Sequence, residues 1–239
     1  MAIERKAVIF GKVTDFENHP LEGASVEIRD DHFNTIYKTL TDNKGEYKIF
    51  VQKGSYLALI AHKDYKTKNL EYWAWNPPAY NNLQIDPRIG GIEVYAMNAF
   101  KPQGAYPSLL IYFRPMSLKR SRNPPKKTGV IDISPDLSAD DIDLKINGSS
   151  VKILELNRVQ EYAGGIGSVI AYLAQSTLPR RSLIAYLIQA ALHSKKLEAG
   201  KEVEYLRIDL SLIDKQTGEK GAGCLFWKRQ ERPAIALES

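Results

Sequence analysis

LEGASVEIRD, residues 21–30, opens the stretch that decides the fold, and TDNKGEYKIFV (residues 41–51) and KGSYLAL (residues 53–59) follow it. Val26 and Ile28 share one face of an expected strand, because side chains in a strand alternate between its two faces. The second and third segments show the same alternation. Short strands separated by turns at this spacing indicate a β-sandwich.

The second segment begins with a turn at residues 41–45, TDNKG. Asp and Asn side chains hydrogen-bond their own backbone there, and Gly45 accepts a positive φ. Tyr47 then begins a new alternation, and a Gly-x-Tyr at residues 54–56 opens the next strand. We expect a further strand at residues 7–13, before this run.

Four short motifs in this region carry a resemblance to a known family: Gly11-Lys12-Val13-Thr14-Asp15, Pro20-Leu21-Glu22-Gly23-Ala24-Ser25-Val26, Thr41-Asp42 to Gly45-Glu46-Tyr47, and Gly54-Ser55-Tyr56. In their order and spacing, residues 5–68 resemble the carboxypeptidase regulatory-like domain. The resemblance implies a transthyretin-like or prealbumin-like β-sandwich that binds, spaces or stabilises. The zinc peptidase that often accompanies this domain has no counterpart here, and a fold by itself assigns no function.

The chain after this stretch is divided into an extension, a linker and a second domain. Residues 69–116 contain two expected strands, IEVYAMNAF and YPSLLIYFRP, which we place on or against the first sandwich, so that the first domain covers residues 5–116. A linker is expected at residues 117–129, because Pro124-Pro125 favours an extended chain and the surrounding charges favour solvent.

The predicted second domain, residues 130–232, has the pattern of an immunoglobulin-like sandwich. Asn147-Gly148 between two alternating runs is a strong hairpin signal. Residues 205–213 alternate well and turn back into the Cys224 strand. Residues 169–193 are apolar on both faces, which fits central strands or a buried helix, and their β-branched and tyrosine content favours strands. The predicted fold class is therefore all-β with two sandwich domains.

Charge and composition exclude several classes of protein. The net charge is +5, and five basic residues of the linker account for that excess: Lys119, Arg120, Arg122, Lys126 and Lys127. A basic linker is not a nucleic-acid-binding face, so no nucleic acid partner is expected. The longest apolar run is far shorter than the ~18 residues of a membrane span.

The cysteine count and the N-terminal segment bear on the cellular compartment. The single Cys224 excludes an internal disulfide and a multi-cysteine zinc site, and its apolar neighbours indicate a small buried core residue. MAIERKAVIFGKV has no signal-peptide apolar region. As given, the chain is expected to be cytoplasmic, or extracellular if a leader has been removed.

Residues that carry catalysis or bind metals are not indicated. The four histidines lack metal-ligand spacing, and no nucleophile–base signature is present, so we expect no enzyme activity, no cofactor and no metal. The aspartates of residues 136–143 could ligate calcium, but they lack the alternating ligand loop and its glycine. A turn with a solvated face explains them better.

The aromatic stretch LEYWAWNPPAY contains the sharpest candidate site. In an extended chain Trp73 and Trp75 project from one face about 7 Å apart, which suits stacking on sugar rings or on a peptide. Tyr72 lies on the opposite face, and Tyr80, Asp86 and Arg88 could add polar contacts. The alternative is that both indoles fill the end of the sandwich or the interface between the halves, which is the commoner role of large aromatics.

Two functions remain after these exclusions. The first is a non-catalytic structural or protein-interaction module that docks through exposed strand edges and the aromatic extension. The second is a carbohydrate-binding protein with Trp73 and Trp75 as its stacking platform. The expected partner is accordingly a protein or a glycan, and the sequence indicates no oligomeric state.

Overall fold

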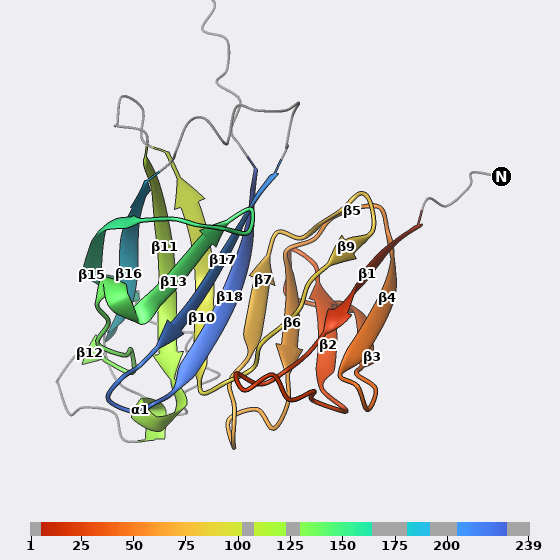
Figure 1. Ribbon diagram of the computed structural model, residues 1–239, viewed down its shortest axis with the longest axis horizontal. Coiled ribbons are helices and arrows are strands. Elements are labelled where there is room, and N and C mark those ends of the chain that lie inside the picture. Colours follow the sequence, from red (N-terminus) through yellow and green to blue (C-terminus); the bar gives the residue numbers. More distant parts are fainter. Residues whose placement is uncertain (1–5, 102–107, 123–129, 164–180, 192–204, 229–239) are drawn as a thin grey trace, which may run out of the picture.

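The computed structural model describes residues 6–101, 108–122, 130–163, 181–191 and 205–228. Strands dominate these ranges, whose helical elements are the five-residue α1 (Leu118–Arg122) and a 3-10 turn at Ala139–Asp141. The predicted all-β class with two sandwiches is confirmed (Figure 1). No helix in the described ranges combines the length and the apolar character that crossing a bilayer requires.

The N-terminal sandwich consists of two facing sheets. Its strands are β1 (Lys6–Lys12), β2 (Ser25–Arg29), β3 (Thr35–Leu40), β4 (Glu46–Gln52), β6 (Ala58–His62), β7 (Tyr72–Trp75) and β9 (Leu83–Gln84). One sheet has the order β4-β1-β9, and the other contains β7-β6-β2-β3. A separate short pair is formed by β5 (Gly54–Ser55) and β8 (Pro78–Ala79).

Alternation and turn chemistry build this sandwich as the sequence predicts. The inward residues of β1, β2, β4 and β6 form one buried cluster, and their outward neighbours face away from it. The Asp42 carboxylate accepts the backbone N–H groups of Lys44 and Glu46 at 2.9 and 2.8 Å, and Gly45 has φ +75°. A Cβ at Gly45 would lie 2.5 Å from the Val13 carbonyl, so this turn also requires glycine for close approach.

The second sandwich surrounds its own buried cluster. Its strands are β10 (Ile92–Phe100), β11 (Ser108–Ser117), β12 (Val130–Ile131), β13 (Ile142–Ile146), β14 (Ser149–Ser150), β15 (Ile153–Ala163), β16 (Arg181–Ala191), β17 (Tyr205–Ile213) and β18 (Lys220–Lys228). On one side β10, β11, β16 and β15 follow one another, and on the other β18, β17 and β13 do. Asn147 and Gly148 have φ 50° and 76°, which confirms the predicted hairpin turn.

β18 joins the two halves. Gly221 and Ala222 pair in parallel with β10, whereas the next residues, from Gly223 to Leu225, pair in parallel with β7. The neighbour of β18 therefore changes within one strand, and a single sheet continues from one sandwich into the other. A Cβ at Gly221 would lie 2.4 Å from the Ile92 carbonyl, so only glycine permits this approach. Cys224 is fully buried at this point, and burial raises the pKa of its thiol.

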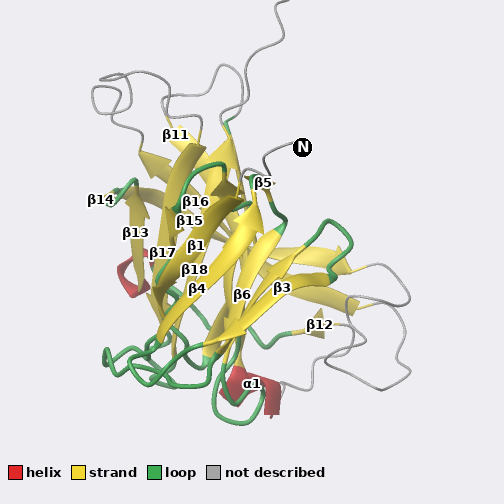
Figure 2. Ribbon diagram, turned by 90° about the vertical axis from the view of Figure 1, so that its right-hand side faces the viewer, coloured by secondary structure: helices red, strands yellow, loops and turns green. Residues whose placement is uncertain are grey.

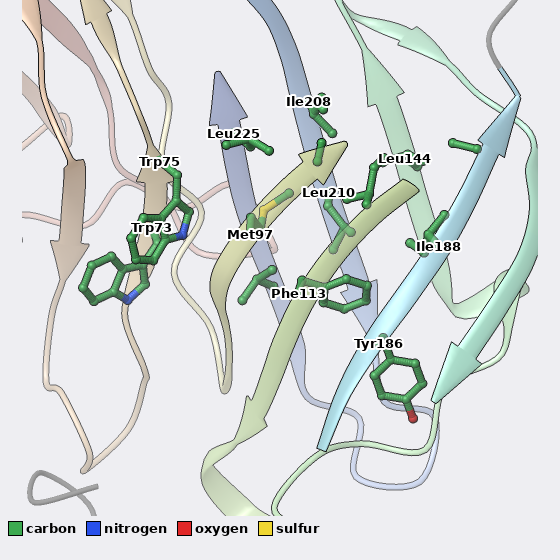
Figure 3. Close-up of a cluster of buried hydrophobic side chains, with 14 of the residues drawn as sticks. Trp73, Trp75, Met97, Phe113, Leu144, Tyr186, Ile188, Ile208, Leu210 and Leu225 are labelled. Atoms are coloured by element: carbon green, nitrogen blue, oxygen red, sulfur yellow. The ribbon is translucent and has the colours of Figure 1, made fainter. Parts of the chain in front are cut away.

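The predicted boundary at residue 116 differs from the packing. The strands predicted at residues 92–100 and 106–115 are expected on or against the first sandwich, but the inward side chains of β10 and β11 belong to the second cluster. There Phe113 stacks on Tyr186 with their ring centroids 5.8 Å apart (Figure 3). The reason is strand pairing: β11 pairs along its length with β16, and β10 pairs with β11 and β18. Sequence proximity to the first sandwich does not decide their place.

The predicted linker is partly docked. Arg120 of α1 forms an ion pair of 3.0 Å with Asp214, which is fully buried, and Lys119 donates from its backbone to Glu219 at 3.0 Å. The end of β11 and α1 are thereby held to the turn between β17 and β18. Residues 123–129 lie outside the described residues.

The described part of the apolar stretch at residues 169–193 is a strand and not a helix. Residues 181–191 form β16, the partner of both β11 and β15. A central strand has neighbours on both edges and both faces covered, which explains the lack of amphipathic alternation. The remaining part of this stretch lies outside the described residues.

Candidate functional site

The two candidate tryptophans lie on one face of β7, as alternation predicts, but they stack on each other. Their ring centroids are 4.9 Å apart with an interplanar angle of 13°, and only 6% of Trp73 and 8% of Trp75 is exposed. Tyr95 of β10 contacts both rings edge-on, at 5.0 and 5.3 Å. Figure 3 shows the indoles at one end of the second cluster. They fill the seam between the halves and offer no open ring face.

Sequence reasoning missed a buried carboxyl group that lies next to the two indoles. Glu93 of β10 is 4% exposed, and its carboxyl accepts the indole N–H of Trp73 at 2.9 Å. Burial raises the pKa of Glu93 to about 8, and the negative charge of Glu71 adds to the effect. Burial likewise raises the pKa of Glu71 to about 7, against the opposing charge of Arg29. Glu93 is therefore largely protonated at neutral pH.

The position of Glu93 carried a weak signal in the sequence. It alternates with Ile92 and Val94, so it lies on the other face of β10, together with Tyr95 and next to the indole of Trp73. Such an alternate position of a strand usually faces solvent. A bulge in β10 between Tyr95 and Asn98, where Ala96 has φ 52°, then transfers the core-facing parity to Met97. The shift of the apolar positions by one residue is visible in the sequence IEVYAMNAF. The sequence does not show that β7 of the first sandwich covers Glu93.

Asp86 and Arg88 come together in a different place, a groove between the halves. Two adjoining hollows of about 370 and 220 Å³ share Arg88, Asp143 and Ser211. Asp86 and Tyr72 line the smaller hollow, on the side of β7 opposite the indoles. Alternation along β7 thus separates the predicted tryptophans from the predicted polar residues. Tyr80, 45% exposed, follows β8 and lines neither hollow.

The charged groups of the groove are held by protein partners. The Arg88 guanidinium lies 4.4 Å over the Phe16 ring and donates to the Phe16 carbonyl at 2.9 Å. Asp86 accepts the Lys12 backbone N–H at 2.9 Å, and Asp143 pairs with Lys145 at 3.1 Å. These contacts position the walls, and the Asp143–Lys145 pair neutralises two of the charges. The groove is a surface of mixed polar and apolar side chains between the sandwiches.

Among the aspartates considered as calcium ligands, Asp141 has a structural role. Asp141 is 8% exposed, accepts the backbone N–H and the hydroxyl of Ser138 at 2.7 Å each, and pairs with Lys215. These bonds cap the 3-10 turn before β13. Across the described ranges, no group of three or more His, Cys, Asp or Glu residues is arranged to hold a metal ion.

On the side of the first sandwich that faces away from the second, β3 forms an open strand edge and carries exposed apolar side chains. β3 and β4 end the orders of their two sheets and lie on the side that faces the viewer in Figure 2. Among the described strands β3 pairs only with β2. On β3, 43% of Ile36 and 62% of Leu40 is exposed. An open edge presents unpaired backbone N–H and C=O groups, which a further strand can complete.

Comparison with known proteins confirms the family resemblance of the N-terminal part. Residues 8–86 match the family model of the carboxypeptidase regulatory-like domain. That family is a regulatory-like domain and not a catalytic one. The comparison with curated proteins gave no match.

Several solved structures are similar over nearly the whole chain at low identity. A candidate carbohydrate-binding protein from Bacteroides uniformis is 12% identical, with 93% of this chain and 99% of that chain covered and a TM-score of 0.29. A DUF3823 family protein from Parabacteroides merdae is 8% identical, with coverages of 93% and 98% and a TM-score of 0.28. The major pilin subunit of Bacillus cereus is 10% identical, with coverages of 93% and 69% and a TM-score of 0.29. Likeness at these scores assigns no function.

Proposed function

We propose that this chain is a non-catalytic protein-interaction module that binds an extended segment of a partner along β3. The observation that carries the proposal is the open β3 edge with the exposed side chains of Ile36 and Leu40. A peptide added to such an edge gains main-chain hydrogen bonds, and alternate side chains give it specificity. The match of residues 8–86 to a non-catalytic family supports the same class of function.

The lysine on the β3 edge is paired with a carboxylate of the neighbouring strand. Exposed edges are often protected by lysine, because an incoming strand must bury its charge. Lys38 in the middle of β3 is paired with Glu27 of β2 at 2.9 Å, and Arg29 pairs with the same carboxylate at 2.7 Å. With Lys38 held toward β2, a partner strand meets the apolar side chains of Ile36 and Leu40.

Selection from a displayed library of random twelve-residue peptides tests this proposal. The wild type should enrich peptides that slow backbone amide exchange within residues 35–40, and replacing both Ile36 and Leu40 by Lys should abolish that binding. Leu154→Lys together with Val159→Lys on β15 is the matched control, because these residues are similarly exposed, at 44% and 38%, and should leave binding intact. Selected peptides that protect other segments, or equal binding by both double variants, would contradict the proposal.

The carbohydrate alternative receives no support from the geometry. Trp73 and Trp75 face each other and Tyr95, and a sugar ring needs an open aromatic face. Titration with a glycan panel should leave the tryptophan fluorescence unchanged. A saturable shift that is lost in Trp75→Phe would restore this alternative.

A further inference from the structure

The outer face of the β4-β1-β9 sheet has an apolar centre that the first sandwich does not use. Ala7 and Ile9 of β1, and Ile49 and Val51 of β4, point into the buried cluster. Their neighbours point outward, and Phe50 among them is 62% exposed in the middle of its strand. Phe50 therefore contributes little to the core of its own domain.

Three outward side chains form this apolar centre. Val8 lies directly opposite Phe50 in the antiparallel register, and Phe10 lies opposite Lys48, one alternation further along β1. Directly opposite residues have Cβ atoms about 5 Å apart and diagonal neighbours about 7–8 Å apart, within reach of aromatic rings. Val8 and Phe10 are half-buried, so the apolar centre is a shallow surface patch and not a pocket.

Lysines surround the centre. Lys6, Lys12 and Lys48 project from the same face, and each is exposed. Glu46 is the acidic residue at the outward positions of β4, directly opposite Lys12. The outward positions of β1 and β4 therefore carry an excess of positive charge around apolar side chains. Surfaces with aromatic anchors and a charged rim are typical of protein docking sites.

We propose that this face binds an acidic segment of a partner protein, with an apolar side chain of that segment on Phe50 and its carboxylates on the lysines. The inference rests on the proposed interaction function, but it concerns a surface other than the β3 edge. Glu46, which begins β4 opposite Lys12 and one alternation from Lys48, disfavours a polyphosphate chain, because a chain that contacted both lysines would meet its negative charge. An acidic peptide with an apolar anchor matches both the centre and the rim.

Fluorescence anisotropy with a labelled twelve-residue peptide of Glu, Asp and Leu tests the proposal. Wild type should bind it saturably, and raising the salt concentration should weaken binding because the rim is exposed. Phe50→Ser should weaken binding at least tenfold and Lys48→Glu severalfold. Phe100→Ser is the matched control, since Phe100 is also an exposed phenylalanine, at 45%, but lies on β10, and it should change nothing. Binding should also slow amide exchange in β1 and β4.

Three comparison probes make the outcome decisive. An acidic peptide without leucine and a peptide with Lys in place of its acidic residues should both bind at least tenfold more weakly, and a single-stranded oligonucleotide should not compete. Tighter binding of the oligonucleotide, or equal binding by Phe50→Ser and wild type, would overturn the proposal. If the peptide fails while library peptides still protect residues 35–40, the interaction function stands and only this face is excluded. Thermal unfolding of Phe50→Ser should match wild type, which confirms that its fold is intact.

Discussion

Two buried glutamates, one in each half of the molecule, have opposite acid–base properties. Glu27 on β2 and Glu93 on β10 are each 4% exposed. Salt bridges and hydrogen bonds lower the pKa of Glu27 to about 2 against the effect of burial, whereas burial raises the pKa of Glu93 to about 8. The exposed fractions are the same, but burial acts more strongly on Glu93, so burial and the neighbours together decide which form is stable.

The neighbours differ in charge and in donor type. Glu27 accepts hydrogen bonds from Ser25 and Thr35 at 3.0 and 2.9 Å and pairs with Lys38 and Arg29. Glu93 accepts the indole N–H of Trp73 and the backbone N–H of Glu71, and it lies close to a second carboxyl group, that of Glu71. The first sandwich thus holds an ionised carboxylate inside a satisfied network, and the seam holds a carboxyl group in its neutral form.

The largest effect is expected from Glu93→Gln. The folded protein retains a proton on Glu93 that the unfolded chain loses above the ordinary glutamate pKa of 4.5, so wild-type stability should fall as the pH rises from 4.5 to 8. Gln mimics the neutral acid, so the variant should be more stable than wild type at pH 9 by about 5 kcal/mol and nearly equal at pH 4.5. Urea unfolding at a series of pH values measures both. A difference that is independent of pH would show that Glu93 is ionised in the folded protein.

Glu27→Gln should have the opposite sign and a smaller magnitude. The folded-state pKa of about 2 lies below the ordinary value of 4.5, so the contribution of Glu27 is present above pH 4.5 and is lost as the pH falls toward 2. At pH 7 the variant should lose roughly 2 kcal/mol, because Arg29 and Lys38 lose their partner while solvent screens the half-exposed Lys38. The same unfolding series should show the loss vanish near pH 2. A stability loss that persists at that pH would point to packing.

Glu71 lies between these two regions, because its pKa responds to Arg29 and Glu27 of one and its charge acts on Glu93 of the other. Glu71→Gln removes the nearby negative charge, so the pKa of Glu93 should fall. The stability slope should then end at a lower pH than in wild type, and stability at pH 8 should rise by between about 1 and 2 kcal/mol. Carbon NMR of the glutamate carboxyl groups follows the Glu93 titration directly. An unchanged Glu93 midpoint would mean that the two carboxyl groups are not coupled.

The structural elements that could be predicted are those that local residues determine. Asp42 with Gly45, and Asn147 with Gly148, specify their turns whatever surrounds them, and alternation in β17 gives its bounds and its inward face. The placement of Tyr72 opposite the two indoles was also correct. These features depend on contacts within a few residues, which a single sequence displays.

The seam and the site could not be predicted, because they depend on distant partners. β18 pairs with β10 at Gly221 and Ala222 and with β7 from Gly223 to Leu225, and nothing in these residues indicates which strands they meet. The expected place of residues 92–100 and 106–115, on or against the first sandwich, differs from the packing for the same reason. The predicted site placed Trp73 and Asp86 on one surface. In the structure β7 and its sheet lie between them, so the two residues belong to different surfaces.

The smallest effect is expected from Trp73→Phe, which tests whether the indole N–H stabilises the ionised form of Glu93. That hydrogen bond lowers the pKa of Glu93 against burial, so its removal should raise the pKa further, opposite to the effect of Glu71→Gln. The loss of one hydrogen bond should cost about 1 kcal/mol at neutral pH. Carbon NMR should place the Glu93 midpoint above that of wild type, and Trp75→Phe is the matched control, because its Nε1 has no hydrogen-bond partner among the described residues. If both variants shifted the midpoint equally, the seam would act on Glu93 through burial alone, and the contrast with Glu27 would reduce to the presence or absence of basic neighbours.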